Sequence, residues 1–279
     1  MIVVERSGIP LEWAQLRVGA LRGRLETSLS LAGARVEALM GIGPSARAYA
    51  GFLSVADPDP GRLRGAVQLG SRAMAGVFAL AAARPGEVVA IDLGRAVRAR
   101  LPGTGPADMA DAGSWLEAFW LAAVARRRAD LDGLCAVPAA VLRASSTRAD
   151  AYVYVQVEAL RAFWAGTDGE AALRLRDALA LTGPALLPDD AVGYALDVAV
   201  PELDLLYRLL DRDAPAFNRA LATALERHRV YWGREDPDGR DSRGYVAWGP
   251  LALAVLASEA GMPIEVASGY LPRALLAWP

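Results

Sequence analysis

The stretch LDLLYRLLDRDAPAFNRALATALERHRVYW, residues 203–232, decides the fold that the sequence predicts, because apolar residues recur at helical spacing on both sides of a turn. Asp213 and Pro215 supply the turn and the restart of the second helix. The apolar residues are Leu203, Leu206, Tyr207 and Leu210 before the turn, and Phe217, Leu221, Ala224, Leu225 and Trp232 after it. We therefore predict two amphipathic helices that pack antiparallel as a helical hairpin.

His228, the single histidine of the chain, falls on the apolar stripe of the second predicted helix. One interpretation is a core or boundary histidine whose ring nitrogens are hydrogen-bonded. The alternative is a general base in an aromatic pocket with Tyr231 and Trp232, assisted by a carboxylate such as Glu226 or Glu117. Glu226 is two residues from His228 and so lies on a different helical face, which weakens that pair.

The composition favours a helical protein. Of the 279 residues, 54% are hydrophobic, and much of this fraction is alanine and leucine, which form helices readily. The length is sufficient to bury a sizeable core. We predict an all-α fold, a multi-helix bundle or α-α array with one small β-hairpin, and a single domain over residues 1–279.

Apolar periodicity and turn residues set the expected elements along the chain. One long helix is expected over residues 11–40, ended by Gly41-Ile42-Gly43-Pro44, and a shorter one over residues 46–55 before a turn at residues 57–61. Alternation of apolar and charged residues after a Leu93-Gly94 turn predicts the β-hairpin near residues 87–101. Further helices are expected from Arg62 to the stop at Pro85, over residues 111–128 with three closing arginines, 150–164 and 168–181, after Pro188, over 250–261, and from Pro272. Residues 233–244 are expected to form a polar, exposed loop, and residues 262–271 an extended segment.

Charge and cysteine content narrow the class of protein. The 30 basic residues, all arginine, and 32 acidic residues give a net charge of −2, so the basic excess of a nucleic-acid-binding protein is missing. Cys135 is the only cysteine, which excludes an intrachain disulfide and fits a reducing cytoplasm. The N-terminus lacks a signal-peptide pattern, and the longest apolar run is too short to cross a bilayer. We expect a cytoplasmic protein that binds neither nucleic acid nor membrane.

Motifs for metals, phosphates and nucleophiles are missing from the sequence. One histidine cannot build a two-histidine metal site, and no HExxH, HxE, CxxC, GxSxG or Walker pattern occurs. Acidic pairs such as Asp57/Asp59 stand in turn contexts, where aspartate is a capping residue. We therefore expect no metal, no cofactor and no catalytic residue outside the alternative set of His228, Glu226 and Glu117.

Four segments together resemble the actinobacterial immunity 49 (Imm49) family of polymorphic toxin systems. They are GSWLEAFWLAAVARRRADLDGLCAVP, AYVYVQVEALRAFW, the stretch of residues 203–232 quoted above, and GYVAWGPLALAVLASEAGMPIEVASGYLP. The likeness spans roughly residues 103–276 in consistent order. It implies an all-α fold and protection of the producing bacterium from a toxin encoded beside the gene. These are packing motifs, so the resemblance assigns no functional residue.

Three functions follow from these observations. The first is an immunity protein that neutralises its cognate toxin by direct protein–protein binding. Its partner surface is sought at the β-hairpin near residues 87–101, the loop at residues 233–244, or the tryptophans near element ends, Trp13, Trp248 and Trp278. The alternative is a tailoring or detoxifying enzyme with an aromatic helical pocket around His228, and the third is an adaptor without a toxin partner. The sequence defines neither the partner-binding residues nor the oligomeric state.

Overall fold

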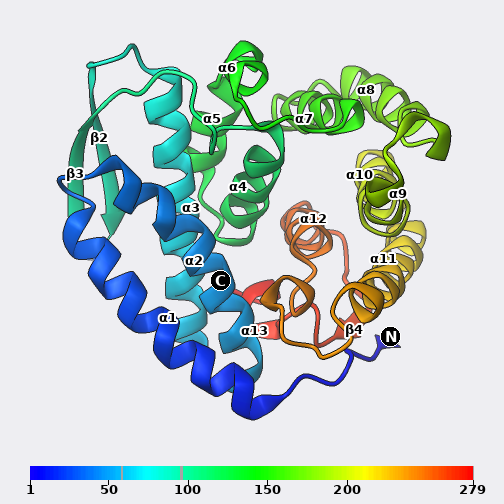
Figure 1. Ribbon diagram of the computed structural model, residues 1–279. Helices are drawn as coiled ribbons and strands as arrows, with labels where there is room; N and C mark the ends of the chain where they lie inside the picture. Colours follow the sequence, from blue (N-terminus) through cyan, green and yellow to red (C-terminus); the bar gives the residue numbers. More distant parts are fainter. Residues whose placement is uncertain (58, 95–96, 279) are drawn as a thin grey trace. The chain divides into compact units, whose positions relative to one another are not determined.

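The computed structural model, shown in Figure 1, describes residues 1–57, 59–94 and 97–278. The chain divides into two compact units, of which unit 1 comprises Met1–Ile9 with Ala149–Leu276, and unit 2 comprises Pro10–Arg148 with Ala277–Pro279. The fold is mostly helical with small two-stranded sheets, which confirms the predicted all-α class and its β-hairpin. The expectation of a single domain over the whole chain stays a prediction.

Unit 2 begins with three consecutive helices that pack side by side, followed by a hairpin and three shorter helices. Its elements are α1 (Leu11–Leu31), α2 (Val36–Ala56), α3 (Pro60–Ala82), β2 (Val88–Gly94), β3 (Val97–Pro102), α4 (Ala112–Val124), α5 (Arg128–Ala136) and α6 (Ala139–Ala144). Pro58 of the expected turn at residues 57–61, and Arg95 and Ala96 of the expected hairpin, lie outside the described residues.

The prediction of one helix over residues 11–40 is wrong. α1 ends at Leu31, the chain turns through Gly33, and α2 starts at Val36, so the expected stop at residues 41–44 lies inside α2. Pro44 removes one hydrogen bond from α2 at a cost of about 3 kcal/mol. Burial of the α2 face offsets this cost, because each fully buried large apolar side chain contributes about 1.5–3 kcal/mol. The large apolar residues buried on that face are Leu39, Ile42, Tyr49, Phe52 and Leu53.

Glycines let the helices of unit 2 approach one another closely. A Cβ at Gly43 of α2 would overlap the side chain of Met74 on α3, and one at Gly70 of α3 would lie 3.2 Å from Cδ1 of Leu121 on α4. The absence of these side chains allows backbone-to-side-chain packing that larger residues would prevent. The helix end predicted from the glycines and proline at residues 41–44 is therefore overturned by tertiary packing, in which Gly43 takes part.

The hairpin β2–β3 is antiparallel, and its inner face packs on α3. Ile91 pairs with Ala99 and both are buried, whereas Asp92 pairs with Arg98 on the exposed face. Gly76 on α3 leaves room for Ile91, because a Cβ there would lie 2.8 Å from Cγ2 of Ile91. The predicted hairpin near residues 87–101 is confirmed, and alternation of buried and exposed residues holds it against the helix.

The arginines expected to close the helix over residues 111–128 do not belong to it. α4 ends at Val124, Arg126 takes a left-handed conformation with φ of 55°, and Arg128 begins α5. The guanidinium Nη2 of Arg127 donates to Oδ1 of Asp130 at 3.0 Å and so links the turn to α5. The run of basic residues therefore forms a corner between two helices instead of a helix end.

Unit 1 contains the remaining helices and a short two-stranded sheet. Its elements are β1 (Ile2–Val4), α7 (Ala151–Trp164), α8 (Asp168–Ala180), the 3-10 turn η1 (Pro184–Leu186), α9 (Asp189–Tyr194), the π-helical turn η2 (Ala195–Ala199), α10 (Val200–Asp211), α11 (Ala214–Glu235), the 3-10 turn η3 (Ser242–Gly244), α12 (Trp248–Glu259), β4 (Val266–Ser268) and α13 (Arg273–Leu276). The helices expected in this half are confirmed, with ends that differ by a few residues.

The predicted helical hairpin of residues 203–232 is confirmed as α10 and α11, which pack against each other. Arg212 adopts a left-handed conformation with φ of 54°, and Oδ1 of Asp213 accepts a hydrogen bond from the backbone N–H of Ala216 at 2.9 Å. These two residues end one helix and cap the next. α10 continues directly from α9 through the π-helical turn η2, so the first arm is longer than the sequence predicts.

The N-terminal strand β1 pairs in parallel with β4, with Ile2 opposite Val266. Asn218 of α11, 3% exposed, supports this sheet, because its Nδ2 donates to the Pro263 carbonyl at 2.9 Å and its Oδ1 accepts from the Glu265 backbone N–H at 2.6 Å. The sequence predicts an extended segment at residues 262–271 but not its pairing with the first residues of the chain.

Candidate functional site

His228 lies on the buried face of α11 and is 5% exposed. Its Nε2 lies 3.1 Å from the carbonyl oxygen of Gly244 in η3. The rings of Tyr270 and His228 form a T-shaped pair with a centroid distance of 5.0 Å, and the Trp232 ring centroid lies 6.2 Å from that of the imidazole. A carbonyl oxygen only accepts, so Nε2 carries the proton of the neutral ring and donates to it. His228 therefore joins α11 to the end of the polar loop.

Burial lowers the pKa of His228 to about 4, although its hydrogen bond with Gly244 acts in the opposite direction. An imidazole with this pKa is neutral at physiological pH and holds a proton poorly. Its donor nitrogen is already engaged by a backbone carbonyl. The surroundings are those of a packed polar group that fixes a loop.

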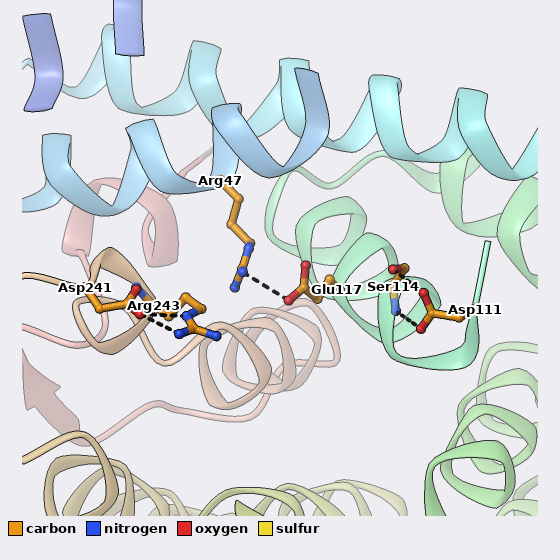
Figure 2. Close-up of polar contacts among 6 residues, drawn as sticks. All are labelled: Arg47, Asp111, Ser114, Glu117, Asp241 and Arg243. Carbon is orange, nitrogen blue, oxygen red and sulfur yellow. Dashed lines mark hydrogen bonds and ion pairs between the residues drawn. The ribbon is translucent and has the colours of Figure 1, made fainter. Parts of the chain in front are cut away.

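The two carboxylates considered as partners of His228 are engaged in ion pairs of their own. Glu226 pairs with Arg229 at 2.6 Å on the partly exposed side of α11. Glu117 on α4 belongs to unit 2, where it pairs with Arg47 of α2 at 3.0 Å, as Figure 2 shows. Tyr231, expected beside His228, meets Tyr194 and Trp232 at centroid distances of 5.6 and 5.3 Å. Of the predicted pocket, the structure places Trp232 against the imidazole.

The polar loop expected at residues 233–244 is held by its own side chains. α11 extends to Glu235, and the loop then closes where Oδ2 of Asp241 accepts from Nη2 of Arg243 at 2.6 Å (Figure 2). The Tyr245 hydroxyl donates to the Gly239 carbonyl at 2.7 Å. The Arg243 guanidinium also lies 5.2 Å from the centroid of the Trp232 ring. The loop is mostly exposed, as predicted, yet its backbone is tied down.

Glu202 is a buried carboxyl group that sequence reasoning missed. It lies in the first turn of α10 and is 7% exposed. Nε2 of Gln156 on α7 donates to Oε2 of Glu202 at 3.3 Å, and a Cβ at Gly249 of α12 would overlap the Glu202 carboxyl. Burial raises the pKa of Glu202 to about 8, an effect that the Gln156 hydrogen bond partly offsets. The group is therefore mainly protonated at neutral pH.

A signal for Glu202 does exist in the sequence. Glutamate in a first helical turn normally faces solvent and interacts with the helix dipole. However, Glu202 stands three and seven residues before Leu205 and Leu209, so it shares their buried stripe. The glycine at position 249 in an otherwise apolar helix marks the space that the carboxyl group occupies.

Unit 2 carries an open cleft of about 530 Å³ between α1, α2, α3 and the β-hairpin. We call it the arginine cleft, because its polar lining consists of Arg22, Glu26, Tyr49, Arg62, Gln68 and Arg72. Its apolar walls are formed mainly by Leu25, Leu29, Leu69, Leu93 and Val97. A volume in this range, with mixed apolar and polar walls, is typical of sites that bind small ligands or peptide side chains.

Two of the three tryptophans expected near element ends stand beside arginines, and the third is buried. The Arg17 guanidinium lies 5.5 Å from the Trp13 ring centroid, and that of Arg64 lies 5.4 Å from Trp278. Trp248, at 7% exposed, belongs to the core of unit 1 and so does not offer a partner surface there.

Residues 1–57, 59–94 and 97–278 lack the features typical of metal sites and of membrane-spanning helices. Within them, no group of three or more histidine, cysteine, aspartate or glutamate side chains is placed to hold a metal ion. In the same ranges, no helix combines the length and the apolar character that a bilayer crossing requires. The prominent chemical features that remain are the buried polar groups of unit 1 and the arginine cleft of unit 2.

The chain is mostly helical, and many of its charged side chains pair with one another. The family model described as Immunity protein 49 matches residues 57–275, and the chain belongs to this family. Membership implies an immunity protein that acts against a polymorphic toxin. No curated protein and no solved structure matches the chain.

Proposed function

We propose that this protein neutralises its cognate toxin by binding it directly, in the cytoplasm of the cell that produces both. Membership of the immunity family carries the proposal, because it implies a toxin as the target. Direct binding blocks a toxin without chemistry and requires only a complementary surface, commonly about 1,600 Å² in total.

The chemistry of the chain supports binding over catalysis. His228, Glu226 and Glu117 each have a partner within the protein fold, and His228 and Glu226 are in a different unit from Glu117. Arginine and aromatic side chains, which often dominate the energetics of protein interfaces, stand together at Trp13 and Trp278.

The proposal is tested by growth of a host that expresses the toxin encoded beside the gene, alone, with this protein, and with the His228→Ala variant. Direct binding predicts rescue by both forms and a complex that survives gel filtration. His228→Ala needs a check of folding by circular dichroism, because it removes a buried hydrogen bond. Rescue without any complex, or rescue lost in a folded His228→Ala variant, would instead support the enzyme alternative.

A further inference from the structure

The arginine cleft has a lining rich in guanidinium groups. Arg22, Arg62 and Arg72 line it together with one glutamate, Glu26, which pairs with Arg22 at 3.0 Å. Side-chain exposure falls from 64% for Arg22 to 39% for Arg62 and 21% for Arg72. The less exposed guanidiniums are the less hydrated ones, so they attract an anion more strongly than a surface arginine does.

Two of these guanidiniums are already held in place. Nη2 of Arg62 donates to the Tyr49 hydroxyl at 2.9 Å, and Nη1 of Arg72 lies 3.4 Å from the backbone oxygen of Asp92. Arg62 also pairs with Asp57, and Arg72 with Asp92, so each arginine of the cleft has one carboxylate partner. Asp57 and Asp92 do not line the cleft. Each guanidinium has five N–H donors, so these contacts leave donors for a ligand. Prior ordering lowers the entropic cost of binding.

The remaining walls favour a ligand that is not purely polar. Leu25 and Leu29 stand on α1, Leu69 on α3, and Leu93 and Val97 on the hairpin. A bare inorganic anion would leave this apolar surface uncovered, whereas a peptide supplies both a carboxylate and apolar side chains. A peptide with alternating acidic and apolar residues matches the two kinds of wall.

We propose that the arginine cleft receives an acidic segment of the cognate toxin, with a carboxylate on Arg72 and Arg62 and an apolar side chain among the leucines. This inference rests on the proposed function, since it names the part of the surface that engages the toxin. It assigns the contact to unit 2, at the inner side of the β-hairpin.

The test measures the dissociation constant of the purified toxin by calorimetry for the full chain and for charge variants of the cleft. Arg72→Glu and Arg22→Glu are each expected to weaken binding about ten-fold or more. Gln68→Glu is a nearly isosteric companion at a half-buried lining position, and we expect a similar loss. Glu26→Gln should tighten binding about two-fold, because it removes the opposing charge.

The matched control is Arg24→Glu. Arg24 is an exposed arginine on the same helix, two residues from Arg22, so it points away from the cleft. We expect its dissociation constant to equal that of the unchanged chain at physiological salt. Thermal unfolding of every variant checks that the fold is kept.

The outcomes separate the two proposals. If the unchanged chain does not bind the toxin, the proposed function fails and this inference fails with it. If the unchanged chain binds and the cleft variants bind the toxin equally well, only the cleft assignment fails. The same holds if Arg24→Glu weakens toxin binding as much as Arg22→Glu does. If glutarate or inorganic phosphate stabilises the unchanged chain but not Arg72→Glu, while toxin affinity stays constant, the cleft is a small-anion site and the inference is overturned.

Discussion

Units 1 and 2 place their ionisable side chains in opposite ways. In unit 1, Asp197, Glu202 and His228 are all buried, with 6%, 7% and 5% of their surface exposed. In unit 2 the arginines of the cleft remain partly exposed, and Asp111, a buried carboxylate of that unit, caps α4 by accepting from the Ser114 backbone N–H at 3.0 Å (Figure 2). Unit 1 therefore couples its stability to the protonation of Glu202 and His228, whereas the arginines of unit 2 are the charges that we propose for binding.

The largest effect is expected from Gly249→Ala in unit 1. The new Cβ would overlap the Glu202 carboxyl and displace it from Gln156, in a helix whose residues are buried from Trp248 to Ala257. Overpacking and a disturbed buried hydrogen bond together should lower the free energy of unfolding by about 3–4 kcal/mol. Urea denaturation measures this loss of unfolding free energy. Gly233→Ala is the control, because its Cβ would meet no atom within 4 Å; a comparable loss there would refute the steric explanation.

The next effect concerns the protonation of Glu202. Its pKa is about 8 in the fold and 4.5 in a model peptide, so between these pH values the folded state keeps a proton that the unfolded chain releases. The contribution of this proton to the free energy of unfolding is complete below pH 4.5. It is lost as the pH rises to 8, at about 1.4 kcal/mol per pH unit. Glu202→Gln keeps the shape and removes the titration. As the pH rises from 5 to 7, the free energy of unfolding of the variant should increase by about 3 kcal/mol relative to that of the unchanged chain. If the free energies of unfolding of the two proteins changed in parallel with pH, the assignment of Glu202 as a buried acid would be contradicted.

His228 should give a smaller effect of opposite slope. Its pKa is about 4 in the fold and 6.5 in a model peptide, so the unfolded chain binds a proton first as pH falls. Its contribution is complete above pH 6.5 and is lost toward pH 4, at about 1.4 kcal/mol per pH unit. His228→Gln, whose amide can still donate to the Gly244 carbonyl, should lessen the acid sensitivity by about 2 kcal/mol between pH 6.5 and 5. Urea titrations at each pH provide the measurement. If the variant lost as much unfolding free energy at low pH as the unchanged chain, a buried neutral imidazole would be contradicted.

The smallest expected effect tests the packing of unit 2. Gly76→Ala places a Cβ 2.8 Å from Cγ2 of Ile91, and should lower the free energy of unfolding by about 1–2 kcal/mol. Ile91→Ala in the same chain removes the clash, so the double variant should lose less than the sum of the two single losses. Simple additivity would show that the hairpin and α3 are not in contact as described.

The same variants examine the predicted single domain. If the two units unfold together, Gly249→Ala and Gly76→Ala shift one common transition, seen equally by far-ultraviolet circular dichroism and tryptophan fluorescence. Two separate transitions, each moved by one variant, would instead define two domains.

Local pattern was sufficient for elements whose periodicity and caps agree. α10 and α11 follow from the leucine spacing and the cap at Asp213, and the hairpin follows from its strict alternation. At residues 41–44 local signals and packing disagree. Glycine and proline there predict a stop, but Gly43 serves close contact with Met74 inside α2.

Long-range features had no local signal. β1 is three residues long, and its partner β4 lies more than 260 positions later in the chain, so only the folded chain shows the pairing. The arginine cleft combines residues of three helices and a hairpin, each unremarkable in its own segment. Glu202 and Gln156 likewise meet across α10 and α7; the leucine spacing indicates that Glu202 is buried, but it does not indicate Gln156 as the partner.

The pairing of β1 with β4 has a consequence for the order of synthesis. The first strand of unit 1 leaves the ribosome before α1, but its partner at Val266–Ser268 appears only after all of α1 to α12. Unit 2 is encoded between the two parts of unit 1 and has most of its chain available much earlier. During synthesis the arginine cleft can therefore form before β4, the partner of β1 in unit 1, has been made.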